Sequence, residues 1–88
     1  MKAKMLNKMK KLQAMFPEMW FKNGDEFYEK ESNFIWTGEG SFIGEESAFC
    51  YFGYSDTCGV NPKLENALNK LGLWAEFYDA GTVFIYES

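Results

Sequence analysis

The amino-acid sequence predicts an α+β domain in which an antiparallel sheet of four to six strands has two helices packed on one face. Two segments, residues 2–16 and 62–71, have the apolar spacing of amphipathic helices. The remaining apolar residues occur in short runs separated by Gly, Asn and Asp, which is typical of strands joined by tight turns. With 88 residues, the chain has the length of a single domain with a thin core, so we predict one domain over residues 1–88.

The first helix is predicted over residues 2–16. Its apolar residues recur at spacings of four, three and four, and they are Met5, Met9, Leu12 and Phe16. Lysines repeat at similar spacing on another face, which makes the helix amphipathic. Pro17 is expected to end it, because a proline disfavours helical geometry at the residue before it.

Residues 19–54 are predicted to form two hairpins and the central strand. The pair Asn23-Gly24 lies between aromatic-rich flanks and favours a two-residue hairpin turn, which would place Trp20 opposite Phe27. A second hairpin is predicted around Gly38-Glu39-Gly40. Residues 47–54 are apolar at both alternate sets of positions, which favours a central strand covered on both faces. A loop is expected over residues 55–60.

The second helix is predicted over residues 62–71, between two helix-terminating features. Asn61 offers a side-chain cap, Pro62 suits the first helical position, and Gly72 suits a left-handed residue at the end.

A C-terminal hairpin is predicted over residues 73–87. If Ala80 and Gly81 form its loop, Phe77 faces Phe84 on one side of the hairpin. The run from Asp79 to Thr82 is interpreted as turn chemistry and not as a catalytic site.

The residue types present argue against enzymatic chemistry. The chain has no histidine, and all nine of its positive charges are lysines. The usual general base and the bidentate guanidinium group are therefore both missing. Its carboxylates lack the spacing of a calcium loop, and Cys50 and Cys58 are predicted to be free thiols. We therefore predict no enzymatic activity, no cofactor and no metal.

The charges are segregated along the chain. Residues 1–14 contain five lysines and no acid, whereas residues 15–60 contain nine acids against two lysines. The resulting net charge of minus seven in that block would attract a basic partner and repel nucleic-acid phosphates, so no direct nucleic-acid binding is expected.

The aromatic content is high, with 17 aromatic residues, and 12 of them lie within residues 16–54. A thin core cannot cover all of these rings, and exposed aromatics surrounded by charge are typical of protein interfaces. The predicted partner-binding residues are the acids Asp25, Glu26, Glu29, Glu31, Glu45 and Glu46 and the aromatics Trp20, Tyr28 and Trp36.

Residues 61–86, with their Asn-Pro start, leucine-containing helix, Gly72 and Glu76–Thr82 turn region, resemble small uncharacterised proteins encoded by bacteriophages and related mobile elements. The resemblance implies a context in which small acidic proteins bind and block host proteins. It implies no active site.

The sequence favours a non-enzymatic protein-binding module that engages a basic partner protein, with phage-type inhibition of a host protein as one form of that function. One alternative is a structural or assembly protein that forms a homodimer through its aromatic face. Another is a binder of membrane surfaces or anionic ligands that uses the lysine-rich N-terminal helix. No apolar run is long enough to span a membrane and no secretory signal is recognised, so we expect a cytoplasmic protein, in a bacterial host if phage-encoded.

Overall fold

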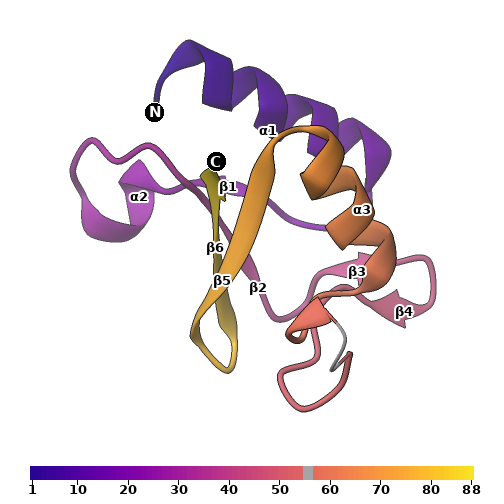
Figure 1. The fold of residues 1–88 in the computed structure, drawn as a ribbon. Coiled ribbons are helices and arrows are strands. Elements are labelled where there is room, and N and C mark those ends of the chain that lie inside the picture. Colours follow the sequence, from indigo (N-terminus) through magenta and orange to yellow (C-terminus); the bar gives the residue numbers. More distant parts are fainter. Residues whose placement is uncertain (55–56) are drawn as a thin grey trace.

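The computed structural model describes residues 1–54 and 57–88. In these residues the chain forms a four-stranded antiparallel sheet, a separate two-stranded sheet and three helices (Figure 1). The helices are α1 (Ala3–Met15), α2 (Asp25–Tyr28) and α3 (Pro62–Lys70). The strands are β1 (Lys22–Asn23), β2 (Ile35–Gly38), β3 (Phe42–Ile43), β4 (Glu46–Ser47), β5 (Leu73–Asp79) and β6 (Thr82–Glu87). The predicted α+β class is confirmed. Two residues of the expected 55–60 loop, at positions 55 and 56, lie outside the described residues.

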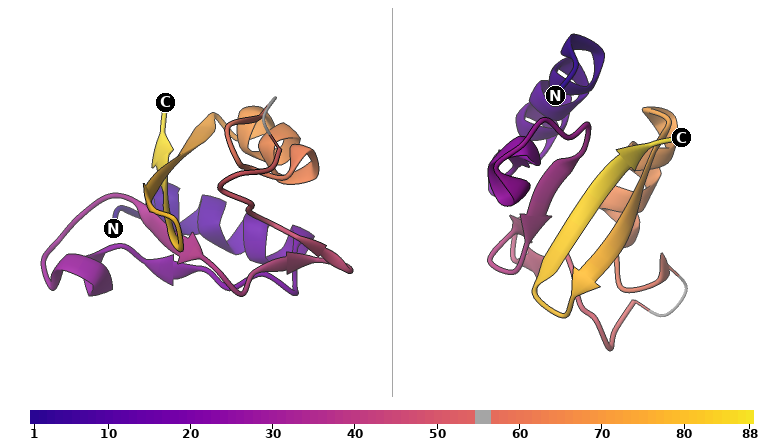
Figure 2. Two further views of the ribbon diagram at one scale, coloured as in Figure 1. Left: turned by 90° about the horizontal axis from the view of Figure 1, so that it is seen from below. Right: turned by 90° about the vertical axis from the view of Figure 1, so that its left-hand side faces the viewer.

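The larger sheet has the strand order β1-β2-β6-β5. Both α1 and α3 pack on one face of this sheet, as the sequence predicted, and their side chains form a single buried cluster with those of the strands. Fully buried members of this cluster include Leu12 from α1, Leu68 from α3 and Ile85 from β6. Figure 2 shows α3 behind β5 and β6 in its right-hand view. We call the face that packs on these helices the core face.

Helix α1 forms where the apolar spacing predicts it. Met5 and Leu12 are fully buried, so the apolar stripe packs into the core of the protein. On the flank of the helix, Lys8 Nζ donates a hydrogen bond to Glu87 Oε2 at 2.8 Å, which ties α1 to β6. The Lys8 ammonium is the main reason why the pKa of Glu87 is lowered from its usual range.

Helix α3 has the predicted features at both ends. The Asn61 side-chain oxygen accepts a hydrogen bond from the Lys63 backbone N–H at 3.0 Å, and Pro62 occupies the first turn. Gly72 follows the helix in a left-handed conformation with φ of 70°. The chain can therefore turn directly from α3 into β5.

The C-terminal hairpin has the predicted loop but not the predicted register. Asp79 pairs with Thr82 around Ala80 and Gly81, and a register shift follows between Phe77 and Asp79. Phe77 consequently faces Val83, not Phe84 as predicted. This bulge shifts the pairing of residues 73–77 of β5 by one position relative to β6, so it changes which aromatics share a face.

The predicted hairpin at Asn23-Gly24 is wrong. Gly24 has right-handed backbone angles, and the Asn23 side-chain oxygen accepts a hydrogen bond from the Asp25 N–H at 2.9 Å. This short-range bond starts the helical turn α2 in place of a hairpin turn. A Cβ on Gly24 would lie 2.5 Å from the Phe34 carbonyl oxygen, so the glycine permits a close approach of two backbone segments.

The predicted hairpin around Gly38-Glu39-Gly40 is also wrong. β2 pairs with β1 and β6, while β3 pairs with β4. The Glu39 N–H donates to the Gly81 carbonyl at 2.9 Å, so β2 continues along β6 to its end. The chain then leaves the sheet and forms the small β3–β4 hairpin by itself.

The predicted central strand over residues 47–54 does not form. The region contributes the end of β4 and one isolated bridge between Phe49 and Val60, and Phe52 is 93% exposed. The inner strand that is apolar on both faces is β6, in which Val83, Phe84 and Ile85 are all buried. A strand that is apolar on both faces does lie inside the sheet, but that strand is β6 and not residues 47–54. In that segment Gly53 and a left-handed Tyr54 turn the chain away from the sheet.

Candidate functional site

The second face of the four-stranded sheet is lined by aromatic side chains. One row of directly opposed residues crosses all four strands, running from Lys22 through Trp36 and Phe84 to Glu76. In the next row Trp74 lies opposite Tyr86, with ring centroids 4.9 Å apart. We call this surface the aromatic face. It consists of Phe27, Tyr28, Phe34, Trp36, Trp74, Tyr78, Phe84 and Tyr86.

Phe84 is the centre of the aromatic face. It is 3% exposed, and its ring lies 4.9 Å from that of Phe27, 4.5 Å from that of Phe34 and 5.0 Å from that of Tyr78. The Phe27 pair is edge-to-face and the other two are tilted. Because Phe27 belongs to α2, these contacts pack the short helix onto the sheet.

Helix α2 lies on the side of the sheet opposite α3, as Figure 1 shows, and it covers only one end of the aromatic face. Its Phe27 packs between Trp36 and Tyr78, with centroid distances of 5.0 and 5.2 Å. Three large rings stay accessible: Trp74 is 42% exposed, Tyr28 46% and Tyr78 55%. The exposed part of the aromatic face thus runs along β5, with Tyr28 exposed at the α2 end.

Trp20 and Trp36 meet at the β1 edge of the sheet, with ring centroids 5.8 Å apart. The indole N–H of Trp20 donates to the Glu39 carbonyl at 2.9 Å, and the Trp20 carbonyl accepts from the Thr37 hydroxyl at 2.6 Å. Lys22 places its ammonium 5.0 Å from the Trp36 ring, at cation–π distance. Both tryptophans are half-buried, so of the three predicted aromatic anchors Tyr28 is the most accessible.

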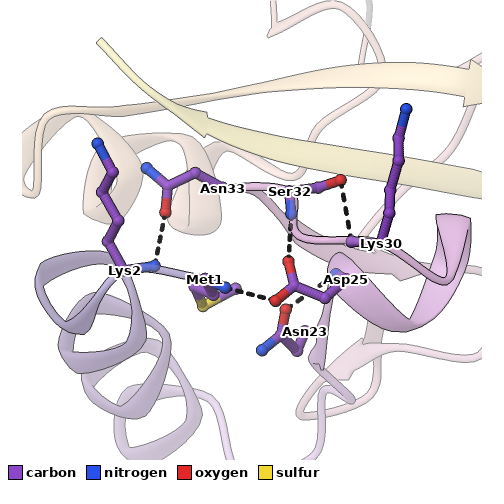
Figure 3. Close-up of polar contacts among 7 residues, drawn as sticks. All are labelled: Met1, Lys2, Asn23, Asp25, Lys30, Ser32 and Asn33. Carbon is purple, nitrogen blue, oxygen red and sulfur yellow. Dashed lines mark hydrogen bonds and ion pairs between the residues drawn. The ribbon is translucent and has the colours of Figure 1, made fainter.

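The carboxylate of Asp25 makes contacts within the fold, to Met1 and Ser32 (Figure 3). One carboxylate oxygen pairs with the Met1 amino group, and the other accepts from the Ser32 N–H at 2.6 Å. These hydrogen bonds lower the pKa of Asp25, with the bond to the Met1 amino group as the largest cause. Nearby, the Lys2 N–H donates to Asn33 Oδ1 at 3.1 Å. This bond and the Asp25 contacts together join the residues just before α1 to Ser32 and Asn33.

The other predicted acids fall into two groups at opposite ends of the molecule. Glu26, Glu29 and Glu31 are exposed on and just after α2, beside the aromatic face. Glu45 and Glu46 lie on the β3–β4 hairpin, which both Figure 1 and the left-hand view of Figure 2 place far from α2. The acids that are clustered in sequence are therefore not one surface.

Glu46 is also engaged within the fold. The Asn61 side-chain amide donates to Glu46 Oε1 at 3.2 Å, and Lys63 Nζ lies 3.1 Å from the same oxygen. The Asn61 bond is the largest cause of the lowered pKa of Glu46, and Lys63 adds to it. Glu46 therefore connects the small hairpin to the start of α3.

The sequence interpretation missed the β5 contribution to the aromatic face. Trp74, Glu76 and Tyr78 lie on this face and are all exposed. The alternation of two aromatic residues around Glu76 was visible in the sequence, but the one-residue bulge decides which β6 residues lie opposite them. Burial, followed by the charge of Glu76, raises the pKa of the Tyr86 phenol above its usual range.

The described residues can also be compared with the requirements of a metal site, a small-molecule cavity, a disulfide and a membrane span. Within residues 1–54 and 57–88 no three Cys, Asp or Glu side chains form a group that could hold a metal ion, and no cavity suited to a small molecule is found. Cys50 and Cys58 are exposed and free, as predicted. No helix in the described part of the chain is both long and apolar enough to cross a bilayer.

Comparisons with protein-family models, curated proteins and solved structures found no match to this chain. The resemblance of residues 61–86 to small phage-encoded proteins therefore stays a prediction.

The carboxylate contacts predict how stability depends on pH. Asp25, Glu46 and Glu87 all have lowered pKa values in the fold, so each contributes stability that is present above its unfolded pKa and lost as pH falls through its folded pKa. We expect the denaturant midpoint to be constant at neutral pH and to fall from about pH 5 downward.

The measurement is urea unfolding at a series of pH values, for the native chain and for Asp25→Asn. The variant should be less stable at pH 7 and should lose less stability on acidification, because it has one linked carboxylate fewer. Parallel curves for the two proteins would show that Asp25 is not among the groups responsible.

Proposed function

We propose that this chain is a non-enzymatic protein-binding module that engages a basic partner protein through its aromatic face and the carboxylates beside it. The observation that supports this most directly is the group of exposed rings, Trp74, Tyr78 and Tyr28, on a sheet face that α1 and α3 leave open. Large exposed apolar patches on monomeric proteins often mark interaction sites, and aromatic residues are enriched at the centre of interfaces.

Charge favours a basic partner over an acidic one. Glu26, Glu29 and Glu31 lie beside the rings at the α2 end, and Glu76 lies among them on β5. The whole chain has a net charge of −4, which steers cationic surfaces toward it. Stacking of nucleic-acid bases also uses aromatic sheet faces, but it needs a cationic groove for the phosphates. Only Lys22 and Lys30, among the described lysines, lie over rings of this face or its β1 edge, and the carboxylates of Glu26, Glu29, Glu31 and Glu76 outnumber them.

A membrane-binding role for α1 has less support. The apolar stripe that would enter a lipid surface includes Met5 and Leu12, and both are fully buried in the core. Lys8, on the flank of the same helix, is paired with Glu87. Insertion of this apolar stripe into a lipid surface would therefore require the helix to leave the fold.

The test compares two pairs of exposed rings. Trp74→Ser with Tyr78→Ser should lower capture of basic proteins from a lysate of the native host at least about tenfold, because central aromatic anchors each contribute about 2 kcal/mol or more. Tyr51→Ser with Phe52→Ser removes rings of similar or greater exposure from a loop outside the aromatic face and should leave capture unchanged.

Capture is measured by quantitative mass spectrometry of the bound fraction, after circular dichroism has shown that both variants are folded. Equal capture by the native chain and the Trp74/Tyr78 variant would contradict the proposal. Sedimentation separates the homodimer alternative, since a dimer formed through the aromatic face would dissociate in that variant without any added partner.

A further inference from the structure

Strand β5 forms an open edge of the larger sheet. It is the outermost strand, seven residues long, and β6 is its one neighbour in the sheet order. Among the described residues, no backbone hydrogen bond joins residues 74–79 to any segment other than β6. The right-hand view of Figure 2 shows β5 at the side of the sheet with no strand beyond it. Such an edge has free N–H and C=O groups that can bind an added strand.

The pairing pattern identifies the free groups. The Ser88 N–H donates to the Gly72 carbonyl at 2.9 Å, so these two residues form a hydrogen-bonded pair. Hydrogen-bonded and non-bonded pairs alternate along an antiparallel ladder, so Trp74 and Glu76 direct their backbone groups toward β6. Leu73, Ala75 and Phe77 therefore direct theirs outward.

The side chains along this edge define what could bind beside it. Trp74, Glu76 and Tyr78 alternate on the aromatic face, and all three are exposed. An added strand would place its own alternate side chains next to them, since neighbouring strands bring side chains on one face into contact. The edge therefore favours a strand with a cationic residue at its centre and an apolar residue two positions away on each side.

A second copy of this chain fits the edge poorly. An antiparallel pairing of two β5 strands through the outward groups of Leu73, Ala75 and Phe77 has Ala75 at its centre. Each Glu76 then lies opposite Trp74 of the other copy, and the two Glu76 carboxylates are diagonal neighbours on one face. Neither strand provides a cation between them, whereas a basic segment does. The charge pattern thus disfavours self-association and favours a basic segment.

We propose that β5 binds an extended segment of the basic partner as an added strand, with a Lys or Arg beside Glu76 and apolar side chains against Trp74 and Tyr78. The backbone groups of Leu73, Ala75 and Phe77 provide the hydrogen bonds, and the three side chains provide the selectivity. This inference rests on the proposed function and adds to it the conformation and the sequence pattern of the bound segment.

The first test selects binders from a displayed library of random peptides on the immobilised protein. The selected peptides should share a Lys or Arg flanked two positions away by apolar residues. Glu76→Lys should weaken them by about tenfold or more, which corresponds to about 1.4 kcal/mol. Glu65→Lys, on α3 and so on the other side of the sheet, reverses the same charge and should leave their affinity unchanged. Failure to select this pattern, or equal loss in both variants, would overturn the proposal.

The second test concerns the backbone. Ala75→Pro removes one outward N–H, leaves the three side chains in place and should abolish peptide binding. In the native chain, hydrogen exchange of the Ala75 and Phe77 amides should slow at least about tenfold when a selected peptide binds, which needs no folded proline variant. Unchanged exchange at both amides would exclude strand addition.

The outcomes separate this inference from the proposed function. If the Trp74/Tyr78 variant loses capture but Ala75→Pro does not, a partner binds the aromatic face without adding a strand, and only the inference fails. If the Trp74/Tyr78 variant retains capture, the proposed function fails. Concentration-dependent dimers that Ala75→Pro abolishes would identify a second copy as the occupant and would also overturn the inference.

Discussion

Replacing Gly38 by alanine is expected to destabilise the protein by about 2–5 kcal/mol, from the added costs of an unfavourable φ and of a steric overlap. Gly38 has φ of 155°, and a Cβ there would lie 2.2 Å from the Gly81 carbonyl oxygen. That oxygen also accepts the Glu39 N–H at 2.9 Å, so it cannot move without opening the end of the β2–β6 pairing. A domain of this size loses about 4–8 °C in Tm for each kcal/mol.

Two other glycines provide matched controls. Gly44 has φ of 63° but no atom within 4 Å of an added Cβ, so Gly44→Ala should cost only the conformational part, about 1–2 kcal/mol. Gly24 has an ordinary φ but a Cβ there would lie 2.5 Å from the Phe34 carbonyl oxygen, so Gly24→Ala isolates the overlap. Thermal unfolding of the three variants measures both costs. A Gly38→Ala variant no less stable than Gly44→Ala would contradict the close packing of β2 on the hairpin turn.

The elements that could be predicted from the sequence are those with short-range causes. α1 follows from one apolar stripe and a terminating proline, and α3 follows from the Asn61 cap and Gly72. The loop of the C-terminal hairpin needs only Ala80 and Gly81 between paired residues. In each case the decisive contacts lie within a few residues of one another in the chain.

The middle of the chain could not be predicted because long-range contacts decide its structure. The pair Asn23-Gly24 has two local solutions, a hairpin turn or a capped helical turn, and packing of Gly24 against Phe34 selects the second. β2 pairs with β6, more than forty residues away, and not with its sequence neighbour β3. Propensity and periodicity do not encode such a partner.

The candidate site was predicted in part. Trp36 and Tyr28 do lie on the aromatic face, with Trp20 at its β1 edge. Glu45 and Glu46 lie at the other end of the molecule, because residues 41–47 leave the sheet as a separate hairpin. Trp74 and Tyr78 were missed because their face depends on the bulge before Asp79, and a one-residue shift in register exchanges the two faces of a strand.

Phe84→Ala is expected to destabilise the protein by about 3–5 kcal/mol, the usual cost of removing a buried phenylalanine ring. The ring is 3% exposed and contacts the rings of Phe27, Phe34 and Tyr78. Its loss leaves a cavity beneath α2, which has only four residues and no other layer behind it. Since single domains are stable by only about 5–15 kcal/mol, the variant should be close to unfolding at 37 °C.

The matched control is Phe42→Ala, which removes the same ring from a position 47% exposed on β3 and should cost under about 1 kcal/mol. Urea unfolding gives both values, and Phe84→Leu should recover much of the loss because it refills most of the volume. If Phe84→Ala were as stable as Phe42→Ala, the aromatic face would not be a packed layer. Exposed rings on such a face would then lack the fixed positions that a specific interface requires.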